Sequence, residues 1–149
     1  MTKDVLVTVS GLQFAQGEQG EEIEVTTSGN YYKKNNKHYV LYEEVMEGFH
    51  AVTKNVIKFD DEMFNLTKKG ATNVNMLFEQ NKRNVTNYVT PYGAFLVGVD
   101  ARKIDVEEEE GNIHVSIDYS LDVNYEHLAD CKINLHIVSK NQEGFSLMN

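Results

Sequence analysis

Residues 111–123 read GNIHVSIDYSLDV, and apolar side chains alternate with polar ones along this stretch. The apolar row consists of Ile113, Val115, Ile117, Tyr119, Leu121 and Val123. Successive side chains of a β-strand point to opposite faces, so the alternation predicts a strand with one buried and one solvated face. Gly111-Asn112, just before the row, is a turn signal. Half-solvated strands of this kind are typical of antiparallel sheets.

The same period of two recurs on both sides of this stretch, with turn-forming residues roughly every 10 to 15 positions. Because nearly every connection is short, neighbouring strands are expected to pair as antiparallel hairpins in an up-and-down meander. Such a meander leaves two unpaired edges unless it closes on itself. We therefore predict an all-β barrel of about 8–10 strands, in a single domain that spans residues 1–149. The predicted strands cover residues 3–14, 21–34, 37–46, 53–60, 62–69, 72–80, 83–90, 93–107, 111–124 and 130–139.

The Asn35-Asn36 pair predicts the register of one hairpin. Asparagine tolerates positive φ better than most residues, which suits a two-residue hairpin turn. This turn pairs Tyr32 with Tyr39 and Tyr31 with Val40. Apolar residues of the two strands then share a face, which supports the register.

The last hairpin is predicted with a loop over residues 124–130. This loop pairs Val123 with Cys131, so that the apolar rows of both strands face the same side. On the polar face, the same register places Asp118 opposite His136.

The only proline of the chain, Pro91, lies in the sequence TPYG at residues 90–93. Proline cannot donate to a strand ladder, so it belongs at a strand end, an edge or a bulge. Gly93 permits backbone dihedrals that other residues avoid. The stretch therefore predicts a sharp corner between two strands.

Charge and composition exclude several classes of partner. The formal net charge of −9 argues against nucleic acid and anionic membrane surfaces, both of which attract clustered Lys and Arg. No apolar run reaches about 18 residues, and the N-terminus alternates at once, unlike a secretory signal. A single cysteine, Cys131, excludes an intrachain disulfide. We expect a cytoplasmic protein that binds neither nucleic acid nor membranes.

Six short stretches carry a family resemblance. They are YEE at 42–44, TKNVIK at 53–58, KG at 69–70, YVTPYG at 88–93, GNI at 111–113 and IDYSL at 117–121. In this order and spacing the chain resembles the YwiB-like family of small bacterial proteins, over nearly its whole length. The resemblance implies a calycin-type β-barrel, similar in shape to lipocalins and fatty-acid-binding proteins. It implies no activity, because the family is described as one of unknown function.

Motifs for metal binding and catalysis are weak in this sequence. His127, Cys131 and His136 are close in sequence, but the predicted register places Cys131 and His136 on opposite faces, where they cannot share an ion. Cys131 lies in an apolar row, as an inert buried thiol does. The sequence contains no nucleophile elbow and no Gly-rich phosphate loop. We expect a non-catalytic protein with no metal and no cofactor.

Glu44 is the strongest candidate for a site residue. It shares the parity of Val40 and Tyr42, the predicted inward face, where a carboxylate is costly unless it is paired. One hypothesis makes Glu44 the polar anchor of a mostly apolar pocket. Burial would then raise its pKa, and a nearby lysine such as Lys54 or Lys58 would lower it. The alternative places Glu44 at the barrel rim, bonded to backbone or to a lysine. The candidate ligand-binding residues are Tyr42, Glu44, Tyr88, Thr90 and Tyr92.

Tyr32, Tyr39 and Leu41 are large side chains on the predicted outer face. They form a candidate surface for a protein partner or a homodimer. Tyrosines that face each other across two strands also stabilise an exposed sheet without any partner. Two functions follow as hypotheses. The first is binding of a small, largely apolar or polar-headed ligand inside the barrel. The second is a protein-interaction module that uses this outer face and has a filled interior.

Overall fold

The computed structural model describes residues 3–11, 24–46, 51–70, 73–90 and 93–140. No helix in these ranges is long and apolar enough to cross a bilayer. The described residues form ten strands and each predicted strand overlaps one of them. The strands are β1 (Asp4–Ser10), β2 (Glu24–Lys34), β3 (Lys37–Met46), β4 (Ala51–Phe59), β5 (Met63–Lys69), β6 (Val74–Glu79), β7 (Lys82–Thr90), β8 (Gly93–Glu109), β9 (Asn112–Val123) and β10 (Glu126–Ser139).

The strands form one antiparallel sheet in the order β6-β5-β4-β3-β2-β1-β10-β9-β8-β7. Pairing of β1 with β10 joins the two ends of the meander, so the remaining edges, β6 and β7, are consecutive in the chain. Backbone hydrogen bonds between Asn73 and Val89, of 2.8 and 3.0 Å, connect these edges at one point. The Asn84 amide adds a bond of 3.0 Å to the Leu77 carbonyl oxygen. The predicted all-β meander is confirmed, and its barrel is nearly closed.

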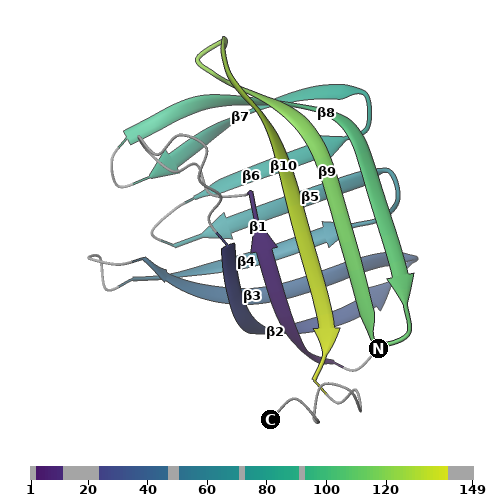
Figure 1. The fold of residues 1–149 in the computed structure, drawn as a ribbon. Helices are drawn as coiled ribbons and strands as arrows, with labels where there is room; N and C mark the ends of the chain where they lie inside the picture. Colours follow the sequence, from purple (N-terminus) through teal and green to yellow (C-terminus); the bar gives the residue numbers. More distant parts are fainter. Residues whose placement is uncertain (1–2, 12–23, 47–50, 71–72, 91–92, 141–149) are drawn as a thin grey trace.

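Figure 1 shows the strands β3 to β6 crossing β1, β8, β9 and β10 at a steep angle. Strand β2 belongs to both groups, because its first part pairs with β1 and its last part pairs with β3. Gly29 pairs with both neighbours, Val5 on β1 and Tyr42 on β3. A Cβ atom at Gly29 would lie 2.7 Å from the Leu41 carbonyl oxygen, so the strand can bend here only without a side chain.

The hairpin at Asn35-Asn36 forms as predicted. The φ angles of the two asparagines are 55° and 65°, as a hairpin turn of this length requires. Tyr32 pairs with Tyr39 and Lys34 with Lys37.

The predicted register of the last hairpin is wrong, although its parity is right. The chain turns directly at Asn124 and Tyr125, whose φ angles are 51° and 70°, instead of forming a loop over residues 124–130. This turn places Val123 opposite Glu126. If the pairing continued unchanged, apolar residues of β9 would lie opposite polar residues of β10. A register shift between His127 and Ala129 inserts one residue and restores the parity. Cys131 therefore pairs with Tyr119, Lys132 with Asp118, and His136 with His114.

The corner at TPYG is also confirmed. Strand β7 ends at Thr90, β8 begins at Gly93, and these two residues pair. The φ angle of Gly93 is 136°, a region that side-chain-bearing residues rarely adopt. Pro91 and Tyr92 themselves lie outside the described residues.

Aromatic rings cross the barrel interior from β2 to β9. Consecutive ring centroids lie 4.7 to 6.1 Å apart, within the range of favourable aromatic contacts. The rings of Phe59, Phe64, Phe78 and Tyr119 are inaccessible to solvent. This part of the interior is therefore a packed core. In order along the chain of contacts, the rings are Tyr31, His38, Phe59, Phe64, Phe78 and Tyr119.

Candidate functional site

A cluster of polar side chains lies inside the barrel on β3, β4 and β5. Glu44 pairs with Thr53 across β3 and β4, and Asn55 pairs with Lys68 across β4 and β5. Each of these residues occupies an inward position, two or four residues from a fully buried apolar side chain of its own strand. The alternation that forms the core therefore also directs these four polar side chains into the interior. We call Glu44, Thr53, Asn55 and Lys68 the interior polar cluster.

The Glu44 carboxylate is the centre of the interior polar cluster. Lys68 Nζ donates a hydrogen bond of 2.5 Å to Glu44 Oε1. Asn55 Nδ2 donates to the same oxygen at 3.1 Å, and to the Thr53 carbonyl oxygen at 3.4 Å. The Lys68 side chain is 5% exposed and that of Glu44 is 21% exposed. The cation is therefore buried, while its carboxylate partner remains partly accessible.

Stability alone gives a poor account of this ion pair. The free-energy cost of desolvating two charges is several kcal/mol, which is about as large as the gain from their attraction. A protein with apolar residues of similar size in their place is therefore often as stable or more stable. In addition, Thr53 Oγ1 and Asn55 Oδ1 are buried and have no hydrogen-bond partner. A buried polar atom without a partner costs about 1–3 kcal/mol. The interior polar cluster therefore requires a reason other than packing.

Two tyrosines border the interior polar cluster. Burial, and then the charge of Glu44, raise the pKa of Tyr42 above its usual value. The same two causes raise the pKa of Tyr88 to about 12. Both hydroxyls are therefore protonated at neutral pH and able to donate hydrogen bonds. Both tyrosines therefore lie within the field of the Glu44 charge, Tyr42 on the same strand β3 and Tyr88 on β7.

The structure brings together three of the five predicted ligand-binding residues. Tyr42, Glu44 and Tyr88 share the interior region described above. Thr90 is the last residue of β7, and its side chain, like the whole of Tyr92, lies outside the described residues. As the rim hypothesis has it, Glu44 bonds a lysine and lies on the part of β3 that pairs with β4 and no longer with β2. As the pocket hypothesis has it, Glu44 shares the parity of the buried Val40 and Tyr42. Whether these residues bind a ligand stays a prediction.

Lys68 is the lysine that the structure places against Glu44, whereas the sequence offered Lys54 and Lys58 as examples of a lysine nearby. Lys54 and Lys58 alternate with the inward residues of β4, and the Lys58 ammonium lies 5.7 Å from the centre of the outward Tyr39 ring. The sequence contained a usable signal, because Thr53, Asn55 and Lys68 occupy the inward parity of otherwise apolar strands.

The predicted outer surface is assembled on β2 and β3. The rings of Tyr32 and Tyr39 are stacked, with centroids 4.7 Å apart and an angle of 5° between their planes. Tyr32 is 45% exposed. Leu41, two residues from Tyr39, pairs with Asn30 on β2 and Val56 on β4. The three side chains therefore share the outward face of β2 and β3, which we call the outer patch.

The family, the relative and the solved structure that match this chain assign no activity. Residues 7–135 match a family described as a domain of unknown function (DUF1934). The chain is 29% identical over 115 residues to the uncharacterized beta-barrel protein YwiB of Bacillus subtilis (strain 168), an alignment that covers 76% of this chain and 80% of that protein. The crystal structure of the ywiB protein from Bacillus subtilis matches with a TM-score of 0.75 and 23% sequence identity, over 92% of each chain. The structural likeness establishes the fold.

Proposed function

Because this chain belongs to the DUF1934 family, whose description assigns no function, we propose a function from the geometry of the barrel interior. The protein binds a small, largely apolar ligand inside the barrel and catalyses no reaction on it. The polar head of the ligand meets the interior polar cluster, and its apolar part contacts the surrounding core side chains.

The buried ion pair between Lys68 and Glu44 is the observation that carries this proposal. Ligand pockets are mostly apolar and contain a few polar groups that fix the orientation of the ligand. The interior polar cluster matches that pattern, since apolar side chains such as Leu66 and Ile57 adjoin it on the same strands. A buried ion pair that adds little stability is a candidate for a binding role.

Hydrogen-bonding chemistry indicates the kind of head group. An ammonium has three N–H donors, of which Lys68 uses one on Glu44. The protonated Tyr42 hydroxyl adds a further donor. The positive charge of Lys68 is matched by Glu44, so the pair is neutral as a whole. An uncharged head group with at least one acceptor oxygen, such as a hydroxyl or an amide, fits this set of donors.

We also propose that the protein catalyses no reaction and that it is located in the cytoplasm. Burial is the main reason that the pKa of the Cys131 thiol lies above its usual value, which keeps it in the unreactive protonated form. A single free cysteine is also compatible with a reducing compartment.

A second candidate function uses the outer patch of Tyr32, Tyr39 and Leu41. Exposed aromatic side chains are enriched in protein interfaces, and Tyr32 is 45% exposed. In this case the protein would bind a second copy of itself or another protein through β2 and β3.

A binding experiment with matched variants distinguishes the two candidates. The full chain is extracted to remove any bound lipid and then titrated with a dansyl-labelled fatty alcohol, which has an uncharged head. We expect Lys68→Met and Glu44→Gln to weaken probe binding by about tenfold, since each removes a charge-assisted hydrogen bond. Asp60→Asn is the control, because it removes a different ion pair, with Lys37, outside the interior polar cluster.

Absence of probe binding by the extracted wild type would contradict the ligand-binding function. A change of oligomeric state or partner binding in Tyr32→Ser, with probe binding unchanged, would support the outer patch instead. The two results are independent, so each function can fail alone.

A further inference from the structure

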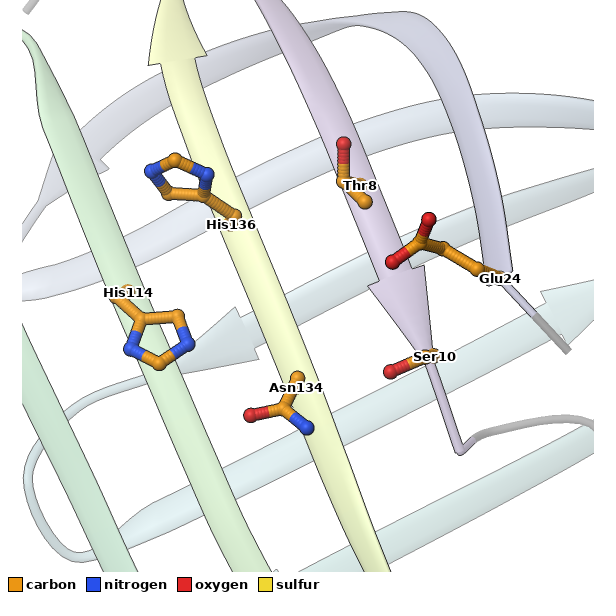
Figure 2. Close-up of a pocket in the computed structure, with 6 residues that line it drawn as sticks. All are labelled: Thr8, Ser10, Glu24, His114, Asn134 and His136. Carbon is orange, nitrogen blue, oxygen red and sulfur yellow. The ribbon is translucent and has the colours of Figure 1, made fainter. Parts of the chain in front are cut away.

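A polar hollow lies on the outer face of the barrel, where β1, β2, β9 and β10 are neighbours (Figure 2). Its volume is about 370 Å³, near the lower end of the range for small-molecule sites. It is separate from the interior polar cluster, because its lining residues alternate with the buried side chains of the same strands. Six side chains line this outer hollow: Thr8, Ser10, Glu24, His114, Asn134 and His136.

Strand pairing fixes the positions of these side chains. Thr8 lies opposite His136, which in turn lies opposite His114, so three strands contribute one row. Ser10 lies opposite both Asn134 and Glu24 in a second row, two residues further along β1. A site built on paired strands holds its groups at defined separations before any ligand arrives, which lowers the entropic cost of binding.

Arginine and aspartate side chains elsewhere on the outer face bond to one another, whereas three of the six side chains that line the outer hollow have no partner among the described residues. Arg83 makes two hydrogen bonds to Asp122, of 2.8 and 3.0 Å, and Arg102 bonds Asp130 at 2.9 Å. Within the described ranges, no hydrogen bond or ion pair engages the side chains of Ser10, Glu24 and Asn134. Ser10 is nevertheless only 6% exposed. The lining therefore offers unused hydrogen-bonding groups, one of them at a nearly buried position.

The charge of the outer hollow restricts its ligands. Burial, together with the neighbouring His114, lowers the pKa of His136, so that its ring is neutral at neutral pH. The two imidazole rings meet edge to face, with centroids 6.0 Å apart. A neutral imidazole offers one donor and one acceptor nitrogen. Glu24 is the one carboxylate of the lining, which disfavours anionic ligands.

We propose that the outer hollow binds a small polyhydroxylated ligand of about one sugar ring. Each hydroxyl group of such a ligand both donates and accepts a hydrogen bond, as do Ser10, Asn134 and His136. The Glu24 carboxylate has two oxygens that can accept from neighbouring hydroxyl groups. A metal ion fits less well, because the described residues form no group of three or more His, Cys, Asp or Glu that could hold one.

Ring resonances of the histidines test this proposal in the full-length chain. Methyl glucoside, methyl galactoside and methyl mannoside are titrated separately while carbon–proton NMR spectra follow each histidine. We expect at least one glycoside to shift the His114 and His136 signals to saturation, and to leave His38 and His127 unchanged. His38 is inside the barrel and His127 lies near the β9–β10 turn, so both report on effects outside the outer hollow.

Substitutions of Glu24 and Ser10 test whether these side chains of the outer hollow bind the glycoside. Glu24→Gln should raise the dissociation constant about tenfold, and Ser10→Ala should raise it by a smaller factor. Asp118→Asn is the control, because this carboxylate faces outward on β9 but does not line the hollow. It should leave the dissociation constant unchanged, and a thermal melt of each variant verifies that it folds.

Other outcomes overturn the proposal. It is wrong if no glycoside saturates the two histidine signals, or if Glu24→Gln and Ser10→Ala both bind as the wild type does. Saturation by putrescine or by Zn²⁺, without any response to glycosides, would assign the hollow to an amine or a metal instead. The dansyl-labelled fatty alcohol should not compete with the glycoside, because the two sites are separate. Absence of glycoside binding would therefore leave the proposed ligand binding inside the barrel untouched.

Discussion

The two ends of the barrel interior are built by the same strands and differ in chemistry. On β4, Phe59 and Ile57 lie at the aromatic end and have no accessible surface, whereas Asn55 and Thr53 lie at the polar end. On β5 the same change takes place between Leu66 and Lys68. Backbone geometry is continuous along both strands, so the difference resides in side chains alone. The aromatic end is packed as a core, and the polar end requires a separate explanation.

Polar groups occur at both ends, but two buried polar atoms at the polar end have no hydrogen-bond partner. At the aromatic end, the Tyr31 hydroxyl and His38 Nδ1 share a hydrogen bond of 2.8 Å, and Glu108 Oε1 lies 3.6 Å from His38 Nε2. At the polar end, Thr53 Oγ1 and Asn55 Oδ1 have no partner. A polar group that serves only the fold is normally satisfied. The contrast indicates that the aromatic end serves stability and the polar end serves binding.

The largest expected effect is at the aromatic end. Phe64→Ala removes a fully buried ring that contacts Phe59 and Phe78. We expect a loss of about 3–5 kcal/mol in the free energy of unfolding, measured by urea denaturation. A loss below that of an exposed substitution such as Val85→Ala would show that this end is not the packed core.

A smaller and non-additive effect is expected at the polar end. Lys68→Met leaves the Glu44 carboxylate without its cation and should cost about 1–3 kcal/mol in the free energy of unfolding. Adding Glu44→Gln should return most of this loss, because the remaining side chains no longer include a charge without a partner. A double variant less stable than either single variant would indicate that the ion pair is there to stabilise the fold.

The stability of the protein should depend on which residue occupies the turn at Asn35-Asn36, near the aromatic end. Asn36→Val places a β-branched residue at a φ of 65° and should cost about 1–2 kcal/mol. Asn36→Gly should be neutral or slightly stabilising, because glycine adopts this φ freely. Thermal denaturation of both variants measures the difference. Equal stabilities would show that the turn does not require positive φ.

The smallest expected effect is a pH dependence from His38. Burial is the main cause that lowers the pKa of His38 below its usual value of 6.5. The unfolded chain therefore binds a proton more readily than the folded one, and stability falls as the pH drops below about 6.5. Between pH 7 and pH 6 we expect a loss of less than about 1 kcal/mol. Urea denaturation of wild type and His38→Gln should show a weaker pH dependence in the variant, and identical dependence would exclude His38 as the source.

Much of this architecture could be predicted from alternation alone. A period of two fixes which face each side chain takes, so the inward positions of Tyr42 and Glu44 follow without coordinates. The register of the last hairpin could not be predicted, because it depends on a turn at Asn124-Tyr125 and on one inserted residue before Ala129. Lys68 was missed for a similar reason. The inward parity of Lys68 was readable from the sequence, but which inward side chain of β5 reaches Glu44 depends on how β5 pairs with β4.

Native mass spectrometry tests the central claim, that the polar end of the interior binds a ligand, most directly. Wild type and the Glu44→Gln/Lys68→Met double variant are purified in parallel without organic solvent. We predict one small molecule of defined mass bound to the wild type, and its loss or strong reduction in a double variant that unfolds at a similar urea concentration. A wild type that contains no small molecule and binds no dansyl-labelled fatty alcohol after extraction would contradict the account, as would equal retention by both proteins.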